Sequence, residues 1–118
     1  MLYNKLLFIA VSVILTINLV QGYIIDHVPF SIDKPGYYIL NKNFTNISSN
    51  YAIKIISSNV ILDGSGFIIE GDKSGSPTQP KIGVIAKGVE NVTIVNLTAN
   101  YWYKGIVIEN VKNSLHFL

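Results

Sequence analysis

The residues of this chain that could do chemistry are its carboxylates, because enzymatic cleavage of a glycosidic bond uses a pair of them. The closest pair is Glu70 and Asp72, which flank Gly71 at the start of a polar segment. No Arg occurs anywhere in the chain to support them. We therefore interpret this pair as solvated loop charges and expect no catalytic residue. The full set of acids is Asp26, Asp33, Asp63, Glu70, Asp72, Glu90 and Glu109.

Asp63 opens a different polar element, the sequence Asp-Gly-Ser-Gly at 63–66. An Asp in such a turn normally accepts hydrogen bonds from the backbone amides that follow it. Glycine at the neighbouring positions permits backbone conformations that other residues avoid. We expect Asp63, Gly64 and Gly66 to form a structural corner.

The chain has few residues that could bind a transition metal. Copper sites in proteins use imidazole or soft sulfur ligands. The chain has only His27 and His116, no Cys, and a single Met at position 1. The two histidines lie at opposite ends of the region that would fold. We expect no metal site and no cofactor.

The aromatic run Tyr101-Trp102-Tyr103 is the candidate ligand-binding element. Exposed aromatic rings stack on sugar rings, and their polar tips bond to hydroxyl groups. Such a run therefore predicts a carbohydrate-binding surface. The alternative is that Trp102 packs beneath a corner of the fold or against the polar segment.

Four Asn-x-Ser/Thr triplets are acceptors for N-linked glycans in an exported protein. The alternative is that Asn and Thr are abundant in the turns of β-rich chains, so that triplets arise from composition. The four positions are Asn43, Asn46, Asn91 and Asn96.

An apolar run over 6–20 follows Lys5 and ends at Val20-Gln21-Gly22. A positive start, a short apolar core and a small-residue exit predict a secretory signal peptide over 1–22, formed as a hydrophobic helix. A retained anchor is the alternative, although spanning a bilayer takes about 20 apolar residues. Either way, residues 23–118 are expected to be secreted or displayed at the cell surface, touching membrane only through 6–22 if uncleaved.

The region 23–118 carries eight Lys against seven acids. This near-neutral balance offers no polybasic face for nucleic acid. An exported domain without Cys has no disulfides, so its stability must come from packing and backbone pairing.

The elements that position these residues are short strands, and they repeat. The segments 83–96 and 105–118 align without gaps, so that Gly83 falls on Gly105 and Asn91 falls on Asn113. The step from Asn59 to Asn91 is longer by the length of the polar segment 72–81, and removing that segment restores the same period. Three short strands and their corners take ~20–25 residues, and each strand then pairs in parallel with its equivalent one turn later.

Asn59, Asn91 and Asn113 fall at the same corner of successive turns. Asn tolerates the left-handed backbone region, and its amide can bond to the equivalent amide in the next turn. We interpret the three as a structural ladder. The sequence thus predicts an all-β domain of about three stacked turns.

The chain resembles the pectin-lyase-like right-handed parallel β-helices, and within them the family named for the periplasmic copper-binding protein NosD, with its carbohydrate-binding and sugar-hydrolysis repeats. The resemblance rests on three stretches: 35–40 (PGYYIL), 58–71 (SNVILDGSGFIIEG) and 91–96 (NVTIVN). It implies a right-handed β-helix from about residue 28 onward. Members of the family usually have many more turns. We therefore expect a truncated or amino-terminal piece whose last turn is open to end-to-end self-association.

The resemblance specifies the fold better than the activity. Our leading expectation is a secreted or cell-surface, non-catalytic module that binds polysaccharide or surface glycans. One alternative is the amino-terminal part of a polysaccharide lyase or glycoside hydrolase whose catalytic turns lie elsewhere. The other is a structural surface or adhesion repeat protein.

Overall fold

The structure is a computed structural model that describes residues 22–117. The predicted signal helix lies outside the described residues. Between 22 and 117, no helix is long and apolar enough to cross a membrane.

The described chain is all-β, with no helix between 22 and 117. The strands are short because Gly, Asn, Ser, Asp and Pro interrupt the β-branched and aromatic runs every few residues. They are β1 (Gly22–Ile25), β2 (Phe30–Ile32), β3 (Gly36–Leu40), β4 (Phe44–Ile47), β5 (Tyr51–Ile55), β6 (Val60–Asp63), β7 (Ile68–Gly71), β8 (Ile82–Lys87), β9 (Glu90–Val95), β10 (Thr98–Asn100), β11 (Lys104–Glu109) and β12 (Lys112–Phe117).

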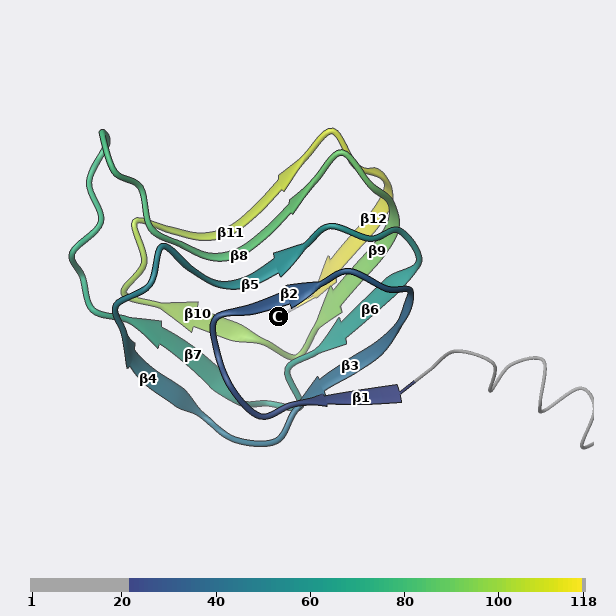
Figure 1. Cartoon of the computed structure of the whole chain (residues 1–118), viewed down its shortest axis with the longest axis horizontal. Helices are drawn as coiled ribbons and strands as arrows, with labels where there is room; N and C mark the ends of the chain where they lie inside the picture. The colour runs from purple at the N-terminus through teal and green to yellow at the C-terminus, as the bar shows by residue number, and fades with distance from the viewer. Residues whose placement is uncertain (1–21, 118) are drawn as a thin grey trace, which may run out of the picture.

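The strands form three sheets in which every pairing is parallel. Sheet A has the order β1-β3-β6-β9-β12, sheet B the order β11-β8-β5-β2, and sheet C the order β10-β7-β4. From β2 onward the chain visits sheets B, A and C in that order and then repeats (Figure 1). Such a topology is compatible with a parallel β-helix.

The register agrees with the aligned repeats. Val84 pairs with Ile106 and Val92 with Ser114, which is the alignment that places Asn91 on Asn113. Val60 pairs with Val92, as the alignment of Asn59 with Asn91 predicts. The polar segment 72–81 lies between β7 and β8 and projects away from the sheets (Figure 1).

Sheet B departs from this register by one residue. The step from Ile53 to its partner Val84 is one position shorter than the step from Val60 to Val92. The corner between Ala86 and Val92 contains one residue more than the corner between Ile55 and Val60. The extra residue is taken up in the turn, so the inward face of each strand stays apolar.

The core fills the space between the three sheets. Aliphatic side chains at alternate strand positions are fully buried, which contributes about 1.5–3 kcal/mol each. No polar or charged residue of the described part is buried. The fully buried large side chains are Ile25, Ile32, Leu40, Ile53, Ile55, Val60, Leu62, Ile69, Val84, Val92, Ile94 and Leu97.

The Asn corner has the backbone that the sequence predicts. Asn59, Asn91 and Asn113 have φ values of 60°, 56° and 56°. The side chain of Asn91 donates a 2.9 Å hydrogen bond from Nδ2 to Oδ1 of Asn59. Asn96 and Asn110 have the same backbone conformation at other corners, and Asn46 has it within β4, at positions that the repeat alignment did not single out.

Candidate functional site

The aromatic run 101–103 occupies the corner between β10 and β11. Trp102 is half-buried against the core, and its Nε1 donates a 3.3 Å hydrogen bond to the Ile69 carbonyl. A Cβ added at Gly71 or at Gly83 would lie 3.0 Å from the indole ring. The absence of side chains at these two glycines therefore leaves the space that the Trp102 ring occupies, and the ring packs against the core.

The two tyrosines that flank Trp102 are more exposed. Tyr101 is 52% exposed and Tyr103 is 44% exposed. The ammonium group of Lys73 lies 4.2 Å from the centre of the Tyr101 ring, a cation–π contact. Tyr103 lies beside Gly75, where an added Cβ would approach the tyrosine Cβ to 2.8 Å. The part of this corner that remains available for a ligand is the tyrosine pair.

Lys81 ties together the two ends of the polar segment 72–81 at its base. Its Nζ donates a 2.7 Å hydrogen bond to the Ser48 carbonyl and a second hydrogen bond to Ser74 Oγ. It also lies 3.6 Å from the Asp72 carboxylate. Hydrogen bonds from the Ser74 side chain and backbone lower the pKa of Asp72. Asp72 thus organises the loop.

The other member of the acid pair, Glu70, lies in β7 opposite Asn100 of β10. Asp72 is engaged by Ser74 and Lys81, whereas Glu70 is the half-buried third residue of its strand. The two carboxylates therefore have different surroundings.

Asp63 has the environment of a corner residue. It accepts a hydrogen bond from the Tyr37 hydroxyl, one of 2.7 Å from the Ser65 amide and one of 3.5 Å from Asn96 Nδ2. The Tyr37 hydrogen bond, followed by the other two, lowers the pKa of Asp63. The same contact raises the pKa of Tyr37.

Gly64 explains why the Asp63 corner needs glycine. A Cβ at Gly64 would lie 2.4 Å from the Asn96 carbonyl oxygen of the next turn. Gly66 has a φ of 80°, in the left-handed region that glycine adopts without strain.

The two histidines lie in separate places. His27 makes a 2.8 Å contact with Asp26 at the surface. His116 lies in β12, paired with Ile94 of β9. Within 22–117, no three His, Cys, Asp or Glu residues come close enough to hold a metal ion together.

The four Asn residues that could carry a glycan are all exposed, but the side chains of three of them form hydrogen bonds within the protein. Asn43 Oδ1 accepts a 2.9 Å hydrogen bond from the Ile68 amide. Asn91 and Asn96 donate from Nδ2, the atom that a glycan would modify, to Asn59 and Asp63. Asn46 lies in β4 with a φ of 53°.

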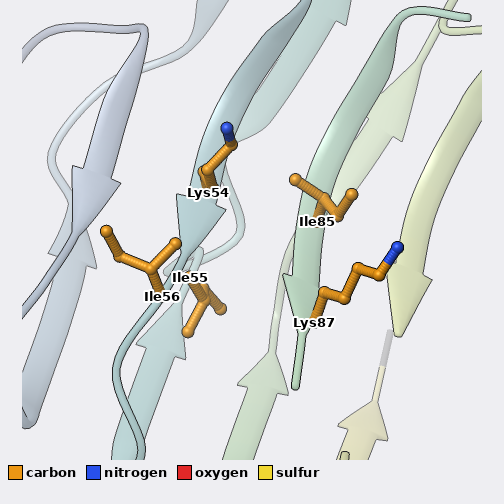
Figure 2. Close-up of a pocket in the computed structure, with 5 residues that line it drawn as sticks. All are labelled: Lys54, Ile55, Ile56, Ile85 and Lys87. Carbon is orange, nitrogen blue, oxygen red and sulfur yellow. The ribbon is translucent and has the colours of Figure 1, made fainter. Parts of the chain in front are cut away.

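Sequence reasoning missed a groove on the outer face of sheet B. It has a volume of about 280 Å³ and is lined by Lys54, Ile55, Ile56, Ile85 and Lys87. Figure 2 shows Lys54 and Ile56 on and just after β5, with Ile85 and Lys87 on the neighbouring strand β8. The register of sheet B brings these side chains together by pairing Lys54 with Ile85, a pairing that the repeat alignment did not give.

The two lysines of the groove have only surface partners. Lys87 Nζ lies 3.3 Å from the Glu109 carboxylate, and both side chains are at least half exposed. Exposed ion pairs of this kind contribute little and exchange readily. Lys54 Nζ lies 4.8 Å from the centre of the Tyr51 ring, whose hydroxyl is 3.2 Å from Ser31 Oγ. The groove therefore combines an apolar floor with two ammonium groups, one of which lies over the Tyr51 ring.

In comparisons with protein-family models, curated proteins and solved structures, none matches this chain.

Proposed function

We propose that this protein is a non-catalytic, secreted or cell-surface module that binds polysaccharide on a right-handed parallel β-helix of the NosD-like kind. The observation that carries the proposal is the groove on the outer face of sheet B, with its isoleucine floor between Lys54 and Lys87. The cyclic order of the three parallel sheets and the resemblance of 35–40, 58–71 and 91–96 support the fold assignment.

The groove suits a saccharide that carries carboxylate groups. Ile56 is 54% exposed and, with Ile85, offers an apolar surface to the C–H face of a sugar ring. The ammonium groups of Lys54 and Lys87 attract an anion, and each supplies three hydrogen-bond donors. Among the described residues, Glu109 is the one acid that pairs with either lysine, so the groove favours an acidic polysaccharide over a neutral one.

The aromatic corner adjoins sheet B, because Tyr103 directly precedes β11, the edge strand of that sheet. The groove is level with Val107, the partner of Ile85, so a polymer that runs from the groove along β11 towards the start of that strand reaches Tyr103. Trp102 takes no part in this contact, since its ring lies on Gly71 and Gly83.

The proposal is tested by titrating a polyuronate and a neutral glucan into the protein and its variants by calorimetry. We expect measurable binding of the polyuronate, weakening as salt is added because exposed charges are screened. Lys54→Ala should reduce the affinity about tenfold, the effect of losing about 1.4 kcal/mol. The matched control is Lys112→Ala at the first position of β12 in sheet A, which should change affinity less than about twofold.

Two results would contradict the proposal. One is equal binding by Lys54→Ala and the parent protein, which would place the ligand elsewhere. The other is release of new reducing ends or unsaturated sugars from the polyuronate, which would make the protein an enzyme.

A further inference from the structure

The outer face of sheet A differs in chemistry from that of sheet B. Strand alternation and register place two rows of side chains across its five strands. Most of these positions hold large apolar or aromatic residues. The first row is Gly22, Tyr37, Ile61, Thr93 and Leu115, and the second row is Ile24, Ile39, Asp63, Val95 and Phe117.

Several of these apolar side chains are well exposed. Ile24 is 61% exposed, Leu115 56% and Phe117 57%. The only charge in the two rows is Asp63, which is held by the Tyr37 hydroxyl, the Ser65 amide and Asn96. The two rows, all within the described chain, thus present exposed apolar side chains around a single hydrogen-bonded carboxylate, and an exposed apolar patch marks an interaction surface.

We infer that the outer face of sheet A is an interface through which two copies of this chain pack face to face. A second copy brings an apolar face of identical width and strand spacing, and sheets pack in this way at about 10 Å. The one charge in the two rows, Asp63, already accepts hydrogen bonds within its own chain, so the facing copy need not supply donors to it. This inference is independent of the glycan groove, which lies on sheet B.

A hollow on this face gives the contact a place for a side chain of the facing copy. It has a volume of about 180 Å³, and Ile61, Thr93, Asn59 and Asn91 line it together with Gly36 and Val60. Cavities of about 150 Å³ hold a benzene-sized group. One aliphatic or aromatic side chain of the partner therefore fits there.

A lipid surface fits the same face less well. The ends of the sheet A strands and the turns beside them carry Lys34, Lys42 and Lys112 together with Asp33 and Glu90. Proteins that lie on anionic membranes usually bring clusters of about four to eight basic residues. The described border of sheet A has no such cluster.

The size of the face sets the strength of the association. Strands of four to six residues, spaced about 4.8 Å apart with a rise of about 3.3 Å per residue, cover about 400 Å² over five strands. Two copies then bury about 800 Å² in total, below the about 1,200–2,000 Å² of a stable interface. We therefore expect a weak dimer whose population depends on protein concentration.

Matched isoleucine substitutions on the two outer faces test this inference by sedimentation of the exported protein, whose amino terminus is determined by mass spectrometry. Ile61→Lys puts a charge at the centre of the sheet A face and should weaken the association at least tenfold. Ile56→Lys puts the same charge on sheet B and should change it less than twofold. Thr93→Lys serves in place of Ile61→Lys if that variant does not fold, as judged by circular dichroism.

Disulfide trapping locates the contact, because the chain has no cysteine of its own. Thr93→Cys should form a covalent dimer under mild oxidation at least five times faster than Val107→Cys on sheet B. Equal trapping at both positions, association that survives Ile61→Lys, or a monomer at every concentration would overturn the inference.

A bimane probe attached to the Thr93→Cys variant identifies any other occupant. A blue shift on adding anionic vesicles to monomeric protein would assign the face to lipid. A buried probe in a monomer that retains residues 1–21 would assign it to that segment. Either result would overturn the inference.

Discussion

The Nδ2 atom of Asn91 donates a 2.9 Å hydrogen bond to Oδ1 of Asn59, which lies at the same corner one turn earlier. Both residues have φ values near 60°. A single residue type thus supplies both the turn geometry and the contact between turns.

Asn91→Ala should lower the free energy of unfolding by about 2–3 kcal/mol, because a left-handed backbone costs a residue such as Ala about 1–2 kcal/mol and the lost hydrogen bond contributes about 1 kcal/mol more. Asn91→Gly loses only the bond and should be about 1 kcal/mol more stable than the Ala variant, since glycine adopts this φ freely. Urea unfolding of the three proteins measures the difference. Equal stability of the Ala and Gly variants would contradict the role of backbone strain.

Gly64→Ala should be among the most damaging small substitutions in the chain. The new Cβ would meet the Asn96 carbonyl at 2.4 Å and the Leu97 Cα at 2.6 Å, so the two turns would have to separate. We expect a loss of about 3 kcal/mol or more, in the range of severe overpacking. Gly105→Ala is the matched control, because the atom nearest to its added Cβ is the Ala99 carbonyl oxygen at 3.3 Å. A Gly64→Ala protein as stable as Gly105→Ala would show that the turns are not in contact there.

The strand content, the parallel register of β8 with β11 and β9 with β12, and the Asn corner were predictable from the sequence. They follow from a local rule, since one period of chain returns each strand to its neighbour and the turn residues recur at the corners. The polar segment 72–81 could be recognised in the sequence as an insertion, because it has no large apolar side chain to place in a core.

The groove on sheet B was not predictable by the same reasoning. The lining of the groove depends on whether Ile85 pairs with Lys54 or with the residue next to Lys54. One extra residue in the corner before Val92 decides this pairing. A shift of one residue moves every side chain to the other face of a strand. The environment of Trp102 could not be predicted either, because it depends on glycines at positions 71 and 83, far from 102 in the sequence.

Trp102 and Tyr103 should separate into a packing residue and a surface residue. Trp102→Ala removes a ring that contacts the core and should cost about 3 kcal/mol of unfolding free energy. Tyr103→Ala, at a side chain that is 44% exposed, should cost less than about 1 kcal/mol. In polyuronate titrations, Tyr103→Ala should weaken binding several-fold while leaving the melting temperature nearly unchanged. A Trp102→Ala protein with unaltered stability would contradict the packing role.

The Tyr37–Asp63 contact should shape how stability depends on pH. The hydrogen bond lowers the pKa of Asp63 in the folded protein, so its stabilisation is complete above the unfolded pKa, about 3.9, and is lost as pH falls through the lower folded value. It raises the pKa of Tyr37, so that contribution is complete below about pH 10 and is lost as pH rises through the higher folded value. Tyr37→Phe removes the partner of Asp63 and should flatten both limbs of the curve while lowering the plateau between them. Urea midpoints from about pH 2.5 to about pH 11 measure this, since the range spans both unfolded pKa values. If Tyr37→Phe keeps the acid limb of the parent protein, another carboxylate is responsible for it.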